Sequence, residues 1–325
     1  MKLKFFTLIM VLIVLTAVFL SCISIPLPSG ESKPETSNNT SSKTSEIPNN
    51  SNPNTDNSGE TSEPGTSEPA TSESETSNTS KPLPASSQSI DWSKKTAAEC
   101  DEYFKNSVIV GDSVMLGFKN YVGQKRATNT GFFSSLKFHV GGSYGVYNAL
   151  APVSSKSVHP LFGGEQTTIE DAVKAMGAER VFILFGLNDL GLYPAGEGPA
   201  ETLENYKKLF SKIKEKNPNT EIVILSATYL YEPWDKKMVK LTSKNLRALN
   251  QLMLEYCNDN GMDYIDVATA LADSKGYLRP EYCSDEECHL TNAAYDVWTN
   301  ILRAYAADKL DGKYSNVSSM TSMFN

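Results

Sequence analysis

Short apolar runs alternate with longer amphipathic stretches between residues 91 and 313, and this alternation limits the possible folds more than any other feature. It is typical of a parallel sheet whose strands are joined by helices. The candidate strands, which are short apolar runs rich in β-branched or aromatic residues, are 108–110, 137–140, 181–185, 222–225 and 264–267.

Four segments between or after these runs are predicted to be helices. A capping-box pattern from Thr167 to Glu170 predicts the start of one helix, which should close near Gly177. The others, with apolar residues at helical spacing, are 201–216, 244–258 and 292–310. We therefore predict one α/β domain over residues 91–313, a three-layer α/β/α sandwich with a five-stranded, mostly parallel sheet.

The chain before residue 91 has a different composition. Lys2 and Lys4 precede an apolar run, so residues 1–22 are predicted to be a signal peptide or a membrane anchor. Cys22 follows a small residue at the end of this run, which resembles the lipid-attachment site of bacterial lipoproteins. Residues 23–90 are mostly Ser, Thr, Asn, Pro and Glu, so we predict a disordered stalk. We expect the domain outside the membrane of a bacterial cell envelope, with residues 314–325 as a tail.

Charge is concentrated outside the predicted domain. The formal net charge of −8 divides into +2 for residues 1–22, −6 for residues 23–90 and −4 for the rest. A domain this close to neutral gives no sign of nucleic-acid binding, so nucleic acid is not expected as a partner. Four cysteines follow Cys22, and exported proteins can form disulfides. Their three possible pairings stay open, although a Cys283–Cys288 bridge would stiffen the loop between them.

Polar and glycine-rich segments follow several candidate strands. They are 111–113, 141–143, 186–189 and 285–291. In an open α/β sheet, ligands bind beyond the carboxyl ends of the strands, where such segments meet. Ser113 lies between a strand and a helix start, where free backbone N–H groups favour negative charge. We therefore expect an active site at this edge of the sheet.

A serine nucleophile needs an adjacent base, and the chain offers three histidines. His139 lies within a candidate strand and His159 in a loop with Pro and Ser, so we interpret them as a packed and an exposed side chain. His289 precedes the last helix, with acidic residues three and four positions upstream, and is the best candidate base. The cysteines at 283 and 288 lack the second ligand pair of a zinc site, so we expect no metal or other cofactor.

Together these segments resemble the four sequence blocks of the SGNH, or GDSL, hydrolase family, in the same order and over about residues 106–305. The matches are Gly111-Asp112-Ser113, a glycine after the second strand, Gly186-x-Asn188-Asp189 and the acid before His289. The resemblance implies a flavodoxin-like sheet, Ser113 as nucleophile and His289 as general base. It also implies an oxyanion hole made by the backbone N–H of Ser113, a glycine N–H and the side-chain amide of Asn188.

The triad acid is open within this resemblance. The family's usual Asp-x-x-His spacing points to Glu286, one residue after Asp285. We favour Asp285, because the segment resembles a variant with one extra residue in some secreted members.

The oxyanion glycine is open as well. We favour Gly142, with Gly141 and Gly145 as alternatives. The two acids within the blocks, Asp112 and Asp189, are expected to contact the substrate.

The resemblance implies a serine esterase, and the predicted position outside the membrane favours acetyl or other short acyl esters of carbohydrate or the cell wall as its substrates. One alternative is an O-acetyltransferase acting on peptidoglycan or exopolysaccharide, because residues 111–117 also resemble the nucleophile block of peptidoglycan O-acetyltransferases. A second alternative is an inactive carbohydrate-binding protein on the same fold, with aromatic side chains that stack on sugars. These side chains are Tyr144, Tyr147, Tyr193, Tyr229, Tyr231 and Trp234.

Overall fold

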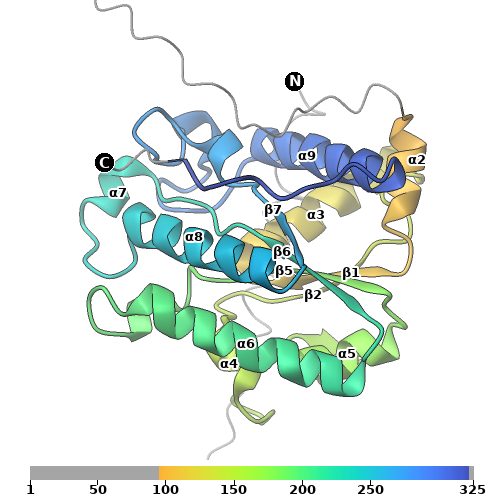
Figure 1. Cartoon of the computed structure of the whole chain (residues 1–325), viewed down its shortest axis with the longest axis horizontal. Coiled ribbons are helices and arrows are strands. Elements are labelled where there is room, and N and C mark those ends of the chain that lie inside the picture. Colours follow the sequence, from red (N-terminus) through yellow and green to blue (C-terminus); the bar gives the residue numbers. More distant parts are fainter. Residues whose placement is uncertain (1–94, 322–325) are drawn as a thin grey trace, which may run out of the picture. The chain divides into compact units, whose positions relative to one another are not determined.

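A five-stranded parallel sheet is the centre of residues 95–321, the part of the chain that this computed structural model describes (Figure 1). Its strands are β1 (Ser107–Gly111), β2 (Lys137–Val140), β5 (Arg180–Leu184), β6 (Glu221–Leu225) and β7 (Asp263–Ile265). They are ordered β2-β1-β5-β6-β7, and each neighbouring pair is parallel. The predicted five-stranded parallel sheet is confirmed.

The interior position of β1 in the sheet explains its apolar sequence. It pairs with β2 on one side and with β5 on the other, and every one of its residues is buried, as expected for a strand covered on both faces. β7 ends at Ile265, two residues earlier than predicted. The next residue, Asp266, turns the chain by accepting the N–H groups of Ala268 at 3.1 Å and Thr269 at 3.0 Å.

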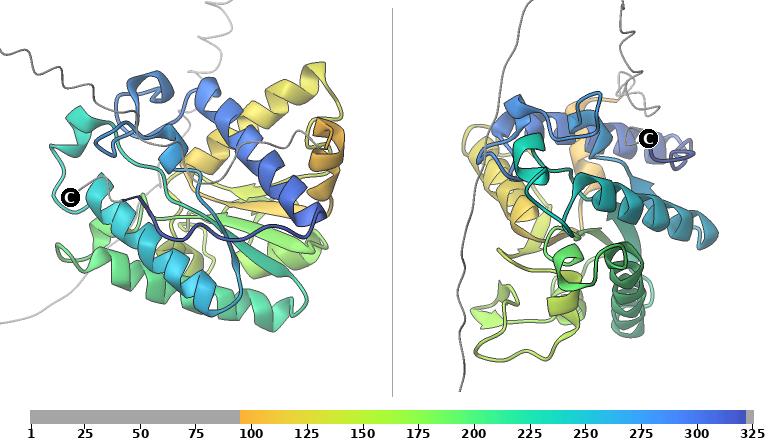
Figure 2. Two further views of the ribbon diagram at one scale, coloured as in Figure 1. Left: turned by 45° about the horizontal axis from the view of Figure 1, so that its top comes forward. Right: turned by 90° about the vertical axis from the view of Figure 1, so that its left-hand side faces the viewer.

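Helices cover both faces of the sheet (Figure 2). They are α2 (Ala97–Tyr103), α3 (Ser113–Thr128), α4 (Val146–Leu150), α5 (Ile169–Ala175), α6 (Gly198–Lys216), α7 (Glu232–Asp235), α8 (Ser243–Asp259) and α9 (Asn292–Leu310). On one face α9 contacts α2 and α3, and on the other α6 contacts α4, α5 and α8. These layers confirm the predicted α/β/α sandwich.

The start of α5 lies one residue later than the capping-box pattern suggests. The N-cap is Thr168 rather than Thr167, and its hydroxyl accepts the N–H of Asp171 at 3.3 Å. The helix ends at Ala175, and the chain leaves it through Gly177, whose φ of +62° suits a residue without a Cβ.

Several short elements were not predicted from the sequence. Among them are α2, which begins with a capping box between Thr96 and Glu99, and the helices α4 and α7. Another is an antiparallel hairpin of β3 (Leu161–Phe162) and β4 (Glu165–Gln166). Strands of two residues are too short to show an alternating pattern, so only turn residues such as the two glycines between them mark this hairpin.

Residues 314–321 extend the folded unit beyond the predicted boundary at residue 313. Asn316 Oδ1 accepts the N–H of Tyr264 in β7 at 2.7 Å, and the N–H of Met320 donates to Gln251 in α8 at 2.9 Å. Val317 and Met320 are buried. Much of the expected tail therefore packs as part of the domain.

Several predictions concern residues outside the described range. These are the signal or anchor in residues 1–22, the lipidation of Cys22 and the stalk over residues 23–90. Within residues 95–321, no helix has the length and apolar character needed to span a membrane. All four cysteines in this range are free thiols.

Candidate active site

Ser113 is the first residue of α3 and lies just beyond the carboxyl end of β1. Asp112 caps this helix, because its Oδ1 accepts the N–H of Val114 at 2.9 Å. The first N–H groups of a helix have no acceptor within the helix. Since the cap bonds Val114, the N–H of Ser113 is left for a ligand.

His289 comes from the other end of the domain and meets Ser113. Its Nε2 is 2.9 Å from Ser113 Oγ, although the two residues are 176 positions apart in the chain. Tyr295, in the first turn of α9, donates its hydroxyl to the carbonyl of Val114 at 2.7 Å. This bond joins the amino-terminal turns of α3 and α9 and explains how the two side chains are brought together. Tyr295 was not singled out from the sequence, where it is one aromatic residue in an amphipathic helix.

Asp285 contacts the other nitrogen of the His289 ring. Its Oδ2 bonds His289 Nδ1, while its Oδ1 accepts the N–H groups of Glu287 at 2.9 Å and Cys288 at 3.1 Å. Glu286 is exposed and has a φ of +62° within the same turn. The acid in contact with His289 is therefore Asp285, the one favoured from the sequence.

The charge state of Asp285 suits an orienting role. Partial burial raises its pKa, but the hydrogen bonds from the His289 ring and from the N–H of Glu287 outweigh this effect and bring the pKa below its usual value. An ionised Asp285 accepts a proton-bearing Nδ1 of His289. The other ring nitrogen, Nε2, can then accept the proton of the Ser113 hydroxyl.

Asn188 supplies a side-chain amide beyond the end of β5. Its Nδ2 donates to the carbonyl of Tyr144 at 3.4 Å, which is longer than an ordinary N–H···O bond. The amide is thus only weakly engaged, and a ligand oxygen can compete for it.

The three candidate glycines after β2 differ in whether their backbone N–H already has an acceptor. The N–H of Gly141 donates to the carbonyl of Gly111 at 3.1 Å, and the N–H of Gly145 donates to Asn148 Oδ1 at 3.0 Å. Within the described range the N–H of Gly142 has no protein acceptor, and Gly142 is exposed. Gly142 therefore offers the free donor that an oxyanion hole requires.

Asp112 and Asp189 do not have the positions expected of substrate contacts. Both are fully buried, so we correct that expectation. Asp189 Oδ1 accepts the N–H of Tyr147 at 3.0 Å, at the start of α4. Each carboxyl group thus accepts a backbone N–H at the edge of the site, that of Val114 for Asp112 and that of Tyr147 for Asp189. Both side chains point into the protein instead of toward a substrate.

The other two histidines are packed against residues outside the Ser113–His289–Asp285 set. His139 is buried in β2, its Nε2 bonds the carbonyl of Thr167 at 3.1 Å, and burial lowers its pKa to about 4. His159 was expected to be exposed, but it is buried beside the ring of Tyr144, with ring centroids 5.7 Å apart. That expectation was wrong, because the loop of His159 folds over the Tyr144 side chain.

Two of the six aromatic residues considered for sugar stacking are excluded by burial. Tyr144 and Tyr229 are fully buried. Tyr147 is 55% exposed, and its backbone is bonded to Asp189, the neighbour of Asn188. Tyr147 is thus the most accessible aromatic candidate at this edge of the sheet.

Among residues 95–321, one group of side chains could hold a metal ion. Ligand atoms of Asp285, Cys288 and His289 lie within 4.8 Å of one another. Asp285 and His289 already bond each other, and burial raises the pKa of the Cys288 thiol to about 12. A metal here would compete with the contacts to Ser113 and needs a thiolate that is not formed at neutral pH. The donor set therefore fits a metal poorly.

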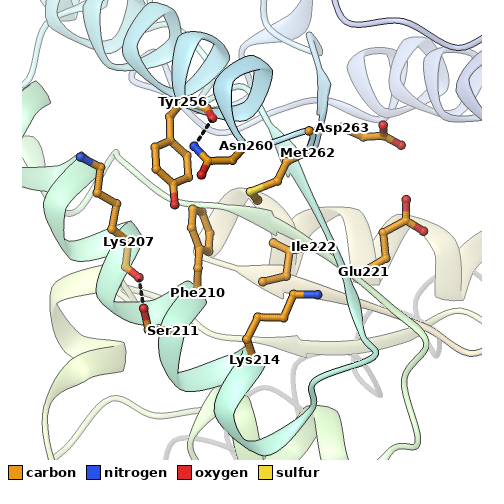
Figure 3. Close-up of a pocket in the computed structure, with 11 residues that line it drawn as sticks. Lys207, Phe210, Ser211, Lys214, Glu221, Ile222, Tyr256, Asn260, Met262 and Asp263 are labelled. Carbon is orange, nitrogen blue, oxygen red and sulfur yellow. Dashed lines mark hydrogen bonds between the residues drawn. The ribbon is translucent and has the colours of Figure 1, made fainter.

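A separate pocket of about 400 Å³ lies between α6 and α8 (Figure 3). It is lined by the first residues of β6 and β7, so it lies at the opposite edge of the sheet from Ser113. Within it, Phe210 stacks on the ring of Tyr256, and Lys207 lies 5.5 Å from the centre of the same ring. These contacts occupy the ring, and the pocket has no part in the site described above.

Comparisons with known proteins place the chain among acyl hydrolases. The profile of the GDSL-like lipase/acylhydrolase family matches residues 109–297. No curated protein matches the chain. Similar solved structures include a GDSL-like lipase from Bacteroides thetaiotaomicron, with 14% identity, a TM-score of 0.47, and coverage of 68% of this chain and 98% of that one.

Two further solved structures are similar over most of their own length. A lipase/acylhydrolase from Enterococcus faecalis has 13% identity and a TM-score of 0.41, covering 62% of this chain and 96% of that one. An acetyl xylan esterase has 15% identity and a TM-score of 0.42, covering 64% of this chain and 100% of that one.

Proposed function

Since the chain belongs to the GDSL-like lipase/acylhydrolase family, and is thus a serine hydrolase, we propose that it is an extracellular esterase for short acyl esters of carbohydrates or the cell wall. The observation that carries the proposal is the continuous series of contacts from Asp285 through His289 to Ser113. In this arrangement a weak nucleophile is bonded to a base, and the base to an orienting acid.

In the proposed mechanism, Ser113 Oγ attacks the acyl carbonyl carbon while His289 Nε2 takes the hydroxyl proton. Asp285 stabilises the imidazolium that results. His289 then returns the proton to the departing alcohol, the bond between carbonyl carbon and alcohol oxygen breaks, and an acyl ester of Ser113 remains. Water attacks this ester with His289 again as the base, which releases the acid and restores the serine.

The negative oxygen of each tetrahedral intermediate needs donors that are already in position. The three groups suited to this role are the N–H of Ser113, the N–H of Gly142 and the amide of Asn188. The first two support the proposal because the helix cap leaves one free and the other has no acceptor among the described residues.

The substrate class rests on location and on one side chain. An enzyme held outside the membrane by residues 1–90 would meet cell-wall and environmental polysaccharides first. The exposed ring of Tyr147 supports a carbohydrate alcohol, because a sugar ring can pack on an aromatic face.

The location can be tested through Cys22. If Cys22 carries a lipid, cells that express the full chain should hold it in the membrane fraction and incorporate labelled fatty acid into it. Cys22→Ser should lose the label. Equal labelling of the wild type and Cys22→Ser would show that the lipid is not attached at Cys22.

The activity is tested with the full chain and its Ser113→Ala variant on p-nitrophenyl acetate and on acetylated xylan. We expect acetate release from both substrates by the wild type only. A wild type no faster than Ser113→Ala removes the esterase proposal. Glycan binding without ester cleavage would favour the carbohydrate-binding alternative.

A glycan acceptor included in the same assay tests the acetyltransferase alternative. Acetate released into water supports the esterase. Transfer of the acetyl group to the glycan instead of to water would favour the acetyltransferase over the esterase.

A further inference from the structure

Two buried carboxyl groups have no role in the mechanism above. Asp112 and Asp189 are fully buried. In each, Oδ1 accepts a backbone N–H, that of Val114 or that of Tyr147. The second oxygen, Oδ2, is buried in both residues and has no hydrogen-bond partner within the described part of the chain. Leaving a charged carboxylate oxygen buried without a donor costs free energy. The unpartnered Oδ2 of both residues therefore needs an explanation.

The surroundings of the two groups offer little positive charge. None of the ion pairs within residues 95–321 includes Asp112 or Asp189. The other titratable side chains that interact electrostatically with one of them are Tyr193, Tyr206, Tyr295, Cys288 and His289. The phenols and the thiol are neutral at neutral pH, because burial raises the pKa of each. His289 alone among them can become a cation.

The two carboxyl groups also oppose each other's ionisation. Burial raises the pKa of Asp112 to about 7, with a further contribution from the negative charge of Asp189, and burial raises the pKa of Asp189 to about 6. Two ionised carboxylates in a site without water repel each other, and this repulsion is absent when one of them keeps its proton.

We propose that Asp112 and Asp189 are positioning residues, of which at least one stays protonated in the active enzyme, and that this keeps the nucleophile turn and the oxyanion loops aligned. Asp112 caps the helix that begins with Ser113. Asp189 directly follows Asn188 and bonds the first turn of α4. The inference rests on the proposed function, because this alignment matters only if Ser113 and the donors act on a substrate.

Close packing makes the alignment sensitive to charge. A Cβ on Gly145 would lie 2.7 Å from Asp189 Oδ1, so the loop after β2 touches this carboxyl group. When both carboxyl groups are ionised they repel each other, and the close contact with Gly145 leaves Asp189 no room to move away. Ionisation should therefore shift the turns that carry Ser113 and Asn188 and slow catalysis.

The test is the pH dependence of kcat and KM for p-nitrophenyl acetate in the full chain, from about pH 5 to about pH 9. The wild type should lose kcat by about tenfold above pH 7, with less change in KM. In Asp112→Asn and Asp189→Asn the amide cannot ionise, yet Oδ1 can still accept the backbone N–H. In both variants two carboxylates can no longer repel each other, so the alkaline fall should disappear.

Asp266→Asn is the matched control. Asp266 is also buried, but its Oδ1 accepts Ser226 Oγ and two backbone N–H groups beyond β7. This variant should keep the alkaline fall of the wild type. The Ser113→Ala variant gives the rate of uncatalysed hydrolysis, which is subtracted at each pH.

A second measurement uses the wild type alone and does not depend on variants that fold. Infrared spectra at about pH 5.5 should contain the C=O stretch of a protonated buried carboxyl group, and the band should be lost by about pH 9. If the wild type is no faster than Ser113→Ala, the proposed function fails. If the wild type is active but the band is absent, or both Asn variants keep the wild-type alkaline fall, the positioning inference alone is overturned.

Discussion

The amide of Asn188 donates to the carbonyl of Tyr144 across 3.4 Å, so its loss should disturb the fold less than the reaction. We expect Asn188→Ala to lower kcat roughly 100-fold, because one oxyanion donor is worth about 3 kcal/mol in the transition state. Initial rates on p-nitrophenyl acetate measure this. Asn245→Ala is the control, since its amide bonds the carbonyl of Lys240 in an exposed part of α8. Equal rates for Asn188→Ala and the wild type would remove Asn188 from the oxyanion hole.

The two acidic residues before His289 should respond very differently to neutralisation. Asp285→Asn should lower kcat by about a thousandfold or more, because an amide no longer favours the ring tautomer with a free Nε2. Glu286→Gln should change kcat by less than about twofold, since an exposed residue outside the contact contributes little. Both variants are measured at neutral pH with saturating ester. The reverse order would make Glu286 the triad acid.

The residues of the site differ in how far the sequence could predict them. Ser113 and His289 follow from motif and position along the chain. The choice of Asp285 over Glu286 needs the turn geometry that brings one carboxylate to the ring. The choice of Gly142 needs the hydrogen bonds that occupy its neighbours. The burial of Asp112 could not be predicted, because its motif looks the same whether the side chain points inward or outward.

At the scale of elements, α3 contains two glycines with opposite environments. A Cβ on Gly117 would overlap the hydroxyl of Tyr295, which bonds Val114 in the first turn. Gly117→Ala should therefore lower the free energy of unfolding by about 1–3 kcal/mol. A Cβ on Gly123 meets nothing within 4 Å, so Gly123→Ala should raise it by about 0.5–1 kcal/mol. Urea unfolding measures both, and equal changes would contradict the packing of α3 on α9.

Long elements that begin with a clear capping residue could be predicted from the sequence, and several short elements could not. The bounds of α9 agree with the prediction, because a long amphipathic stretch follows the capping Thr291. The start of α5 was misplaced by one residue, since Thr167 and Thr168 are chemically alike and only the fold decides which hydroxyl reaches Asp171. The hairpin at residues 161–166 could not be recognised from periodicity at all.

At the scale of the whole domain, the sequence predicts layers but not the contacts that join them. Alternating apolar runs and amphipathic helices are enough to imply a parallel sheet between two helical layers. Periodicity does not give the strand order, in which β1 lies in the interior of the sheet. Contacts between distant segments, such as α2 with α9, depend on side chains that look like ordinary surface charges in the sequence.

One such contact joins α2 to α9 through a nearly buried ion pair. Arg303 Nε and Nη2 each lie 2.8 Å from an oxygen of Asp101, and both side chains are largely shielded from solvent. Arg303→Met should lower the free energy of unfolding by about 3–5 kcal/mol, because Asp101 would be left as a buried charge without its partner. The exposed pair of Lys105 and Glu102 offers the matched control. Lys105→Met should cost less than about 1 kcal/mol. Urea unfolding at neutral pH compares the two, and similar losses would mean that α2 is not held to α9 by this charge pair.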